Sequence, residues 1–459
     1  MSALALLPLL PLLMAAAVPV LLGLLGSRLA AWIAAPEDGA LYRATLYVLG
    51  GTIVLHLLLT LLDLAGIPWH PLLLVILGTA LYLLGRRFLP RGPERGGEWA
   101  GFGWGDGVAL FVLAVFTLFA LSHWTTFSDF VFHWGVKGRR FYVARGTDYT
   151  YLARRWNWVI HPDYPNLLPE IYAVTALLTG RFDLSAMMLE ASVFFALLLA
   201  AAREGLRQGG ASRFTLQAGV AAVACAAATY EIGSVITGGA DGLIALALAA
   251  AVPPLLRPPD RAGDLQVGLA AAFAAGSKME GVTLAAFLVL AQWGRRAWGE
   301  RRPAVGAGLR AGLPVAAVVL PWLWRLSHHH LFQALSSGPF TPSRGPAILA
   351  ATLEALRTPS WHGLLWTMFL PPLLLVHRRA RPFAVAATLQ ILFLYYNYFT
   401  SISAADPRIF ILSNFARLGF QLIPASLVVG LVAWGDEKGG DKPRPSEDTN
   451  PAASVSAAS

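Results

Sequence analysis

Long runs of apolar residues, separated by short polar connections, make up most of this chain. A helix needs roughly 17–25 such residues to cross the hydrocarbon layer of a membrane. The pattern therefore predicts an all-α polytopic membrane protein with about thirteen transmembrane helices. We place these helices near residues 5–26, 41–61, 70–85, 106–125, 185–202, 214–233, 242–256, 265–277, 281–298, 310–326, 361–377, 382–399 and 418–434.

The composition supports a membrane protein and disfavours a soluble one. Of the 459 residues, 56% are hydrophobic and only 13% are charged, whereas about a quarter of a soluble protein is charged. The net charge of +9 comes largely from arginines between apolar runs. Cytoplasmic loops of membrane proteins have this bias, so we expect no nucleic-acid partner. The single cysteine, Cys225, lies in an apolar run, where we expect an inert, buried thiol.

The two ends of the chain differ. The first 34 residues are apolar for longer than the core of a cleaved signal peptide and lack its basic start, so we expect a first transmembrane helix. From Gly435 onward the chain is rich in Gly, Lys, Asp, Pro, Ser and Glu, and this composition predicts a disordered tail.

The arginines predict the orientation. Basic connections should face the cytoplasm, and they carry Arg86, Arg87, Arg91, Arg95, Arg203, Arg207, Arg213, Arg257, Arg261, Arg295, Arg296, Arg301, Arg302, Arg378, Arg379 and Arg381. The alternate connections carry almost no cations and should face outward. The alternation holds only if residues 166–180 form a short helix at, or dipping into, the outer surface instead of crossing.

The polar segment 126–184 breaks this charge rule, because it places cations on the outward side. If residues 129–144 are helical, Asp129, His133, Lys137 and Arg140 fall on one stripe beside aromatic residues. Such a surface would suit an anionic ligand. The alternative is an interfacial helix whose cations reach toward lipid headgroups.

Further ionisable residues lie at predicted outward helix ends. They are Asp241, Lys278, Glu280, Asp406, Arg408 and Arg417. Charges at membrane depth are costly and point to function by default, although each of these residues could also be a structural ion pair or a helix cap.

Four motifs in this order resemble the GT-C superfamily of polyprenyl-phosphate-sugar-dependent glycosyltransferases. They are SDFVFHWGVK, HPDYPNLLPEIYA, GGADGLIAL and GSKMEG, between roughly residues 106 and 300. The nearest resemblance is to the bacterial branch of protein mannosyltransferases, aminoarabinose transferases and the RgtA/B/C/D-like group. The chain would then consist of extra N-terminal helices (1–105), a GT-C-like core (106–300), C-terminal helices (301–434) and a cytoplasmic tail (435–459).

The resemblance implies that Asp129 is the general base that deprotonates an acceptor hydroxyl. The departing phosphate needs positive charge more than a proton donor. Candidate substrate- and phosphate-binding residues are His133, Lys137, Arg139, Arg140, His161, Asp163, Tyr164, Asp241, Lys278, Glu280 and Arg417. Trp134, Trp156 and Trp158 could stack on a sugar or anchor at the membrane interface. His-Pro-Asp stands where the family commonly has His-Pro-Pro, and the first motif has no paired aspartates, which leaves a divalent cation open.

Other chemistries have weaker signals. His328, His329 and His330 are consecutive and cannot all face one metal from a helix, and no ligand spacing accompanies them. A Gly-rich phosphate loop and a nucleophile elbow are both missing from the sequence.

The sequence thus predicts an inverting glycosyltransferase on the outer face of a bacterial inner membrane. Its partners would be a polyprenyl-phosphate sugar, membrane lipids, and a lipid, glycan or protein acceptor. The rival is a transporter or flippase of an anionic or lipid-linked substrate, which should place charges midway along helices and show internal repeats.

Overall fold

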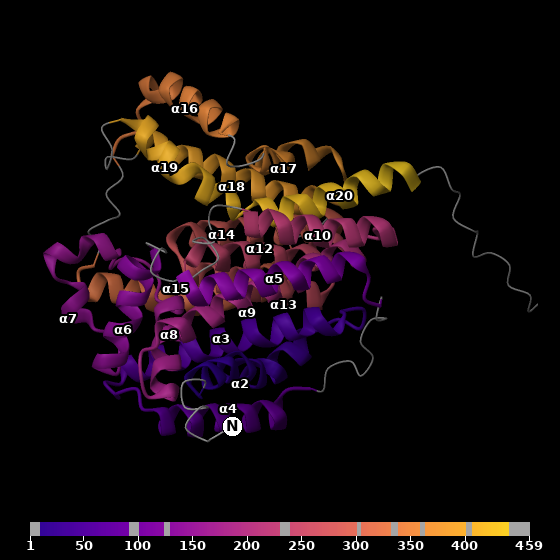
Figure 1. The fold of residues 1–459 in the computed structure, drawn as a ribbon. Coiled ribbons are helices and arrows are strands. Elements are labelled where there is room, and N and C mark those ends of the chain that lie inside the picture. Colours follow the sequence, from indigo (N-terminus) through magenta and orange to yellow (C-terminus); the bar gives the residue numbers. More distant parts are fainter. Residues whose placement is uncertain are drawn as a thin grey trace, which may run out of the picture.

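The computed structural model describes residues 10–90, 101–123, 129–229, 239–300, 304–331, 338–358, 363–400 and 406–439. Within these ranges the regular structure is entirely helical. The long helices lie side by side in one bundle, and shorter helices gather at its ends (Figure 1). The first half contains α2 (Leu10–Ile33), α3 (Ala40–Leu64), α4 (Pro71–Phe88), α5 (Trp104–His123), η3 (Phe130–Trp134), α6 (Gly135–Ala144), α7 (Tyr149–Leu152), η4 (Arg155–Ile160), α8 (Leu167–Thr179), α9 (Leu184–Gln208) and α10 (Arg213–Thr229).

The second half continues the bundle and ends in a bent pair of helices. It contains α12 (Ala240–Leu256), α13 (Arg261–Ser277), α14 (Met279–Glu300), α15 (Val305–His328), η6 (Pro342–Arg344), α16 (Gly345–Arg357), η8 (Leu364–Phe369), α17 (Leu370–Leu373), η9 (Leu374–Val376), α18 (Arg381–Thr400), α19 (Pro407–Phe420) and α20 (Ile423–Gly439). Helix α16 lies against α19, at the margin of the bundle (Figure 1).

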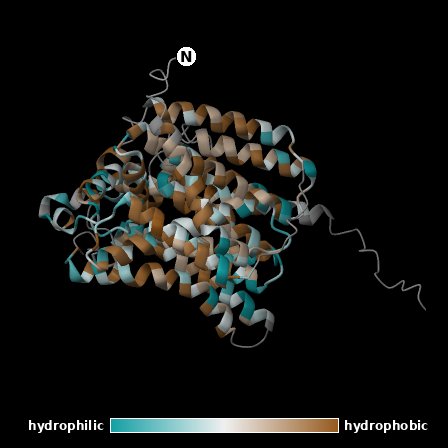
Figure 2. Cartoon of the chain, turned by 90° about the horizontal axis from the view of Figure 1, so that it is seen from below, coloured by the Kyte–Doolittle hydropathy of each residue, from teal (hydrophilic) through white to brown (hydrophobic). Residues whose placement is uncertain are grey.

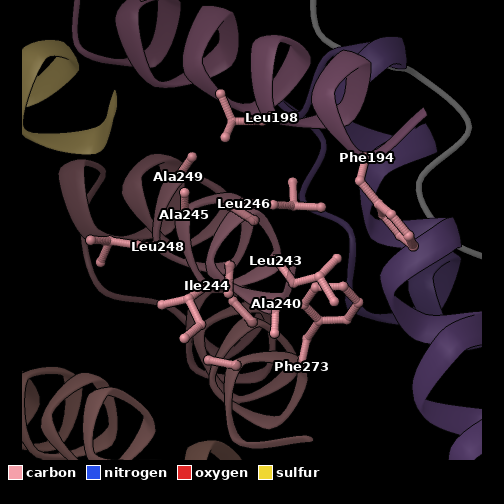
Figure 3. Close-up of a cluster of buried hydrophobic side chains, with 14 of the residues drawn as sticks. Phe194, Leu198, Ala240, Leu243, Ile244, Ala245, Leu246, Leu248, Ala249 and Phe273 are labelled. Atoms are coloured by element: carbon pink, nitrogen blue, oxygen red, sulfur yellow. The ribbon is translucent and has the colours of Figure 1, made fainter. Parts of the chain in front are cut away.

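Helix α12 forms the centre of the bundle. All of its residues are buried, as expected for a helix that is apolar on every side. Leu243, Ile244 and Leu246 pack among residues that include Phe194 and Leu198 of α9 and Phe273 of α13 (Figure 3). Because α12 is fixed on all sides, Asp241 in its first turn has a fixed position.

Glycines let several helices approach closely. A Cβ atom added to Gly51 of α3 would collide with the carbonyl oxygen of Leu22 in α2, and one added to Gly26 would collide with the backbone of α3. Small residues at helix crossings are typical of membrane bundles. They make α2 and α3 a tightly packed pair at one side of the fold.

The structure supports a polytopic membrane protein but does not confirm the number thirteen. Seven described helices are long and apolar enough to cross a membrane, or eight if the bent pair α19 and α20 counts as one span. Apolar residues run along the helices in Figure 2, and many hydrophilic ones lie toward their ends. Helices α8, α10 and α12 are apolar but shorter.

Two predicted spans at the C-terminal side are wrong as single helices. Residues 361–377 are described from Gly363 as three short helices, η8, α17 and η9, and Pro371 and Pro372 cannot donate backbone hydrogen bonds to a continuous helix. The span at 418–434 is broken by a 53° bend between α19 and α20. Pro424, near the start of α20, explains this break.

The predicted tail also begins slightly too early. Helix α20 continues to Gly439 instead of ending at residue 434. Residues 440–459 lie outside the described part of the chain, as do residues 1–9 of the first predicted span.

One end of the bundle collects the arginines of the basic connections, and we call it the arginine end. It is defined by Arg203, Arg207, Arg257, Arg295, Arg310 and Arg379. There Arg257 pairs with the fully buried Asp38 at 2.8 Å, and Arg379 donates to the carbonyl oxygens of Leu256 and Gly209 at the ends of α12 and α9. The prediction that these connections share one side is consistent with this arrangement.

Candidate functional site

The opposite end of the bundle holds the predicted site residues, and we call it the polar end. Its centre is an ion pair between Asp241 in the first turn of α12 and Lys278 in the turn between α13 and α14. The Lys278 Nζ atom lies 3.0 Å from Asp241 Oδ1 and 3.4 Å from Glu280 Oε1. The GSKMEG motif is thus a sharp reversal that directs a lysine at the neighbouring helix.

Arg417, in the last turn of α19, joins this centre to Asp129. Its guanidinium donates to Asp129 Oδ2 at 2.8 Å and lies 3.6 Å from Asp241 Oδ2. The Arg417 and Asp129 side chains are 32% and 19% exposed, whereas Asp241 and Lys278 are almost fully buried. The cluster therefore has a buried floor, Asp241 and Lys278, and an accessible layer, Arg417 and Asp129.

Two glutamines complete this cluster, and the sequence prediction missed both. Gln421, just after α19, donates to Asp241 Oδ1, and Gln390 of α18 donates to the carbonyl oxygen of Glu280 at 3.0 Å. Both glutamine side chains are buried. Burying an amide without a hydrogen-bond partner costs free energy. A glutamine within or beside an apolar run was therefore the sequence signal that could have identified both residues.

The predicted helix at residues 129–144 is confirmed, with a different internal geometry. It begins as the π-helical turn η3, in which the Gly135 amide bonds the Phe130 carbonyl, and continues as α6. A π turn widens the helix and is frequent at functional sites. Asp129 and Lys137 both turn toward the polar end.

The stripe does not extend to Arg140, and two predicted phosphate ligands lie apart from the cluster. Arg140 pairs with Asp148 at 2.6 Å and lies over the Tyr151 ring. Arg139 is exposed. Lys137 is fully buried and donates to the carbonyl oxygen of His161 at 3.1 Å. Lys137 and Arg140 are therefore engaged by groups other than Asp129 and Asp241.

The HPDYP motif forms a rigid turn beside the cluster. His161 has a left-handed backbone, with φ of 51°, and its ring stacks on Tyr164 with centroids 4.4 Å apart. The His133 ring lies 5.2 Å from that of His161. On the other side, Trp322 of α15 donates to the Asp163 carbonyl oxygen at 3.1 Å. The turn is thereby held between η3 and α15.

Asp163 is the unusual residue of this turn. Its side chain is 1% exposed, and neither carboxylate oxygen accepts a hydrogen bond from another residue that the structure describes. Burial raises the pKa of Asp163 to about 6. Burial also lowers the pKa of the neighbouring Lys137 to about 7.

The remaining groups of the turn are kept neutral by their surroundings. Burial, followed by the nearby charges of His133, Lys137 and Lys278, lowers the pKa of His161 to about 3. Burial raises the pKa of Tyr164 well above its ordinary value, and the carboxylates of Glu280 and Asp163 add to that effect. His161 and Tyr164 therefore act at neutral pH as uncharged ring surfaces and hydrogen-bonding groups.

The tryptophans divide between core and surface. Trp134 is buried, with Lys137 over its ring, so neither sugar stacking nor interfacial anchoring fits it. Trp156 is 74% exposed and remains suited to either role. The side chain of Trp158 lies outside the described part of the structure.

Helix α8 corresponds to the short, non-crossing helix predicted at residues 166–180. At 1.5 Å per residue it is about 20 Å long, too short to cross a membrane. It is buried on nearly all sides, packing against α6, α2 and α3, so it does not lie on the surface, and the alternative of a short helix that dips inward stays a prediction. Glu170 in its first turn accepts from His56 Nδ1 of α3 at 2.6 Å.

Arg325 of α15 adds a third member to this buried group, with its Nη1 atom 3.8 Å from Glu170 Oε1. The three side chains of His56, Glu170 and Arg325 are each less than 5% exposed. The sequence prediction did not single out any of them. A histidine and a carboxylate inside apolar helices were the available signals.

The histidine triplet does not converge on one point. His328 stacks on Trp324 with ring centroids 4.7 Å apart, and His329 stacks on Tyr149 at 3.7 Å. His330 has a left-handed backbone. Across the described ranges, no group of three His, Cys, Asp or Glu side chains could hold a metal ion.

Two other sequence predictions have different outcomes. Cys225 lies in α10 as expected, but it is exposed on the surface of the chain, so the expected burial is wrong. Asp406 caps α19 through the Arg408 amide, and Arg408 pairs with Glu354 of α16 at 2.9 Å. These two residues are a cap and an exposed ion pair.

We compared the chain with protein-family models, with curated proteins and with solved structures, and none of them matches it.

Proposed function

We propose that this protein is a membrane glycosyltransferase that moves a sugar from a polyprenyl-phosphate donor to an acceptor hydroxyl. The observation that carries the proposal is the Asp129–Arg417 pair, because a carboxylate and a guanidinium lie side by side at the accessible layer of the polar end. One of these groups can take a proton, and the other can stabilise a phosphate.

The chemistry assigns a role to each group. Asp129 takes the proton of the acceptor hydroxyl as its oxygen attacks the anomeric carbon. The bond from that carbon to the phosphate oxygen breaks, its electron pair stays on the phosphate, and the sugar configuration inverts. Arg417 compensates the charge that gathers on the departing polyprenyl phosphate.

The position of the cluster suits a lipid-linked donor. Asp241, Lys278 and Arg417 lie at or near the ends of apolar helices. A donor whose prenyl chain runs along those helices would bring its phosphate to the same level. We place this end at the outer face of a bacterial inner membrane, with a lipid, glycan or protein as acceptor.

The rival function is transport of an anionic or lipid-linked substrate. Transporters bind their substrate near the middle of the membrane, between broken helices. In this cluster Asp241 and Lys278 lie at helix ends, whereas Arg417 lies just before the bend between α19 and α20. The placement of Asp241 and Lys278 supports transfer chemistry over transport.

The test is transfer of labelled sugar by the purified protein in lipid vesicles, with a polyprenyl-phosphate-linked sugar as donor and bacterial membrane extract as acceptor. Replacing Asp129 with Asn should abolish transfer while the protein stays folded. Asp148→Asn is the matched control, because it removes the carboxylate from another Asp–Arg pair after η3 and should leave transfer intact. Near-normal transfer by Asp129→Asn would refute the role of Asp129. Movement of the intact donor across the bilayer without transfer would establish the rival.

A further inference from the structure

Each terminal nitrogen of the Arg417 guanidinium has a hydrogen-bond partner, whereas Nε makes no hydrogen bond with a residue that the structure describes. One terminal nitrogen donates to Asp129 at 2.8 Å, the other donates to Asn414 at 3.0 Å, and Nε faces Asp241 at 3.6 Å. A phosphate that binds the guanidinium on the side of Asp129 would have to displace that carboxylate.

Of these three groups, Asp129 is the one that can be displaced. Asp241 is almost fully buried and is held by Lys278 and Gln421 as well. Asn414 belongs to the same helix as Arg417 and keeps its place one turn away. Asp129 is partly exposed, and Arg417 is the one ion-pair partner that the described structure shows for it.

The same hydrogen bond also occupies part of the proposed base. Arg417 donates to Asp129 Oδ2, so that lone pair is not available to an acceptor hydroxyl while the pair persists. A phosphate offers several charged oxygens to the guanidinium fork and competes well with a single carboxylate oxygen.

We propose that Asp129 is an internal occupant of the donor-phosphate site, and that the phosphate of the polyprenyl donor frees Asp129 by taking its place on Arg417. This inference rests on the proposed function and adds an order to it: the donor binds first, and Asp129 Oδ2 is freed for the acceptor hydroxyl by that binding. Asp241 and Asn414 hold Arg417 in position during the exchange.

The exchange predicts an unusual binding result. A variant that lacks the Asp129 carboxylate should bind a polyprenyl phosphate more tightly than the natural protein, although it cannot catalyse transfer. Loss of a positively charged ligand residue has the opposite effect. Most substitutions at a binding site weaken binding, so an increase in affinity is diagnostic.

The experiment measures the affinity of the full-length protein in lipid nanodiscs for farnesyl phosphate, with farnesol as the uncharged comparison. Asp129→Asn should bind farnesyl phosphate at least about threefold more tightly than the natural protein, as expected for removal of a partly exposed competing carboxylate. Arg417→Lys should bind at least about threefold more weakly, because lysine lacks the guanidinium fork. Farnesol should bind all variants equally.

The control is Glu354→Gln, which removes the carboxylate from Arg408 at the other end of the same helix α19. It should leave the affinity unchanged. Asp129→Ala serves as a second variant if Asp129→Asn unfolds, which thermal melting reports. If the natural protein binds farnesyl phosphate but Asp129→Asn and Asp129→Ala do not bind it more tightly, or if Glu354→Gln gains equally, the exchange is refuted and the proposed function stands. If the natural protein does not bind farnesyl phosphate above farnesol, the proposed function fails.

Discussion

The two ends of the bundle use the same kinds of charged residue in different ways. At the arginine end, Asp38 accepts from Arg257, Gln208, Gln266 and a backbone amide, and Asp106 accepts from Arg203, Gln217 and a backbone amide. At the polar end, Asp163 is just as buried, but no other described residue donates to its carboxylate.

This difference distinguishes aspartates that stabilise the fold from an aspartate of the candidate site. A buried charge that is fully paired holds helices together, whereas a buried carboxylate without a donor from another residue is costly to the fold. The Asp129–Arg417 pair is a third case, since it is paired but accessible. We therefore propose that the arginine end serves stability and that the accessible layer of the polar end serves chemistry.

The largest effect on stability is expected at the arginine end. Asp38→Asn leaves the buried Arg257 without its main counter-charge, and breaking such a pair costs about 3–5 kcal/mol. The free energy of unfolding in mixed micelles should fall by that amount, while transfer per folded molecule is retained. A loss below about 1 kcal/mol would show that this end is not a scaffold.

The buried floor of the polar end should combine both roles. Lys278→Met removes the main partner of Asp241, so we expect a loss of about 3 kcal/mol together with the loss of transfer. Adding Asp241→Asn removes the uncompensated carboxylate and should restore part of the stability, but not transfer. Recovery of transfer with stability would mean that the pair is only structural.

For Asp163 we expect an effect on the free energy of unfolding that is no larger than these, and one that depends on pH. Its pKa is raised to about 6 in the folded protein, so its ionised form opposes folding above pH 6, and stability is gained as the pH falls from about 6 toward 4. Asp163→Asn should be more stable than the natural protein at pH 7.5, by about 3 kcal/mol.

The difference between these two proteins should shrink as the pH falls to 4. His161, whose pKa is lowered to about 3, has the opposite dependence, because its stabilising contribution is lost between about pH 6.5 and 3. The comparison of natural protein with Asp163→Asn cancels that contribution. A difference in unfolding free energy that does not vary with pH would contradict the assignment.

The smallest effect is expected at the exposed pair of Arg408 and Glu354. Surface ion pairs contribute little, so Glu354→Gln should change neither the melting temperature nor transfer. A clear loss of transfer would extend the site to α16 and weaken the contrast between exposed pairs and the central cluster.

Much of the fold follows from the apolar pattern. Most predicted spans coincide with a helix, and the arginines of alternate connections do gather at one end. The failures have local causes. Pro371 and Pro424 interrupt apolar runs that composition alone reads as continuous, and α8 is too short to span yet is buried by tertiary contacts that its own sequence does not encode.

The sequence allowed several residues of the candidate site to be predicted, but not which of them contact one another. Charges at helix ends identified Asp129, Asp241, Lys278 and Arg417 as candidates, because such charges are costly in a membrane. Asp129 and Arg417 are 288 residues apart in the chain, and no local pattern shows that they meet. Gln421 was missed for the same reason, since its role depends on the position of α12.

The central claim is that chemistry belongs to the polar end and stability to the arginine end. Measuring transfer rate and melting temperature together for Asp129→Asn and Asp106→Asn tests it most directly. We predict that Asp129→Asn loses transfer by at least about 100-fold, as for loss of a general base, and keeps its melting temperature. Asp106→Asn should lower the melting temperature and keep transfer per folded molecule. The account would be contradicted if Asp129→Asn retained transfer, or if both variants lost transfer only in proportion to their stability.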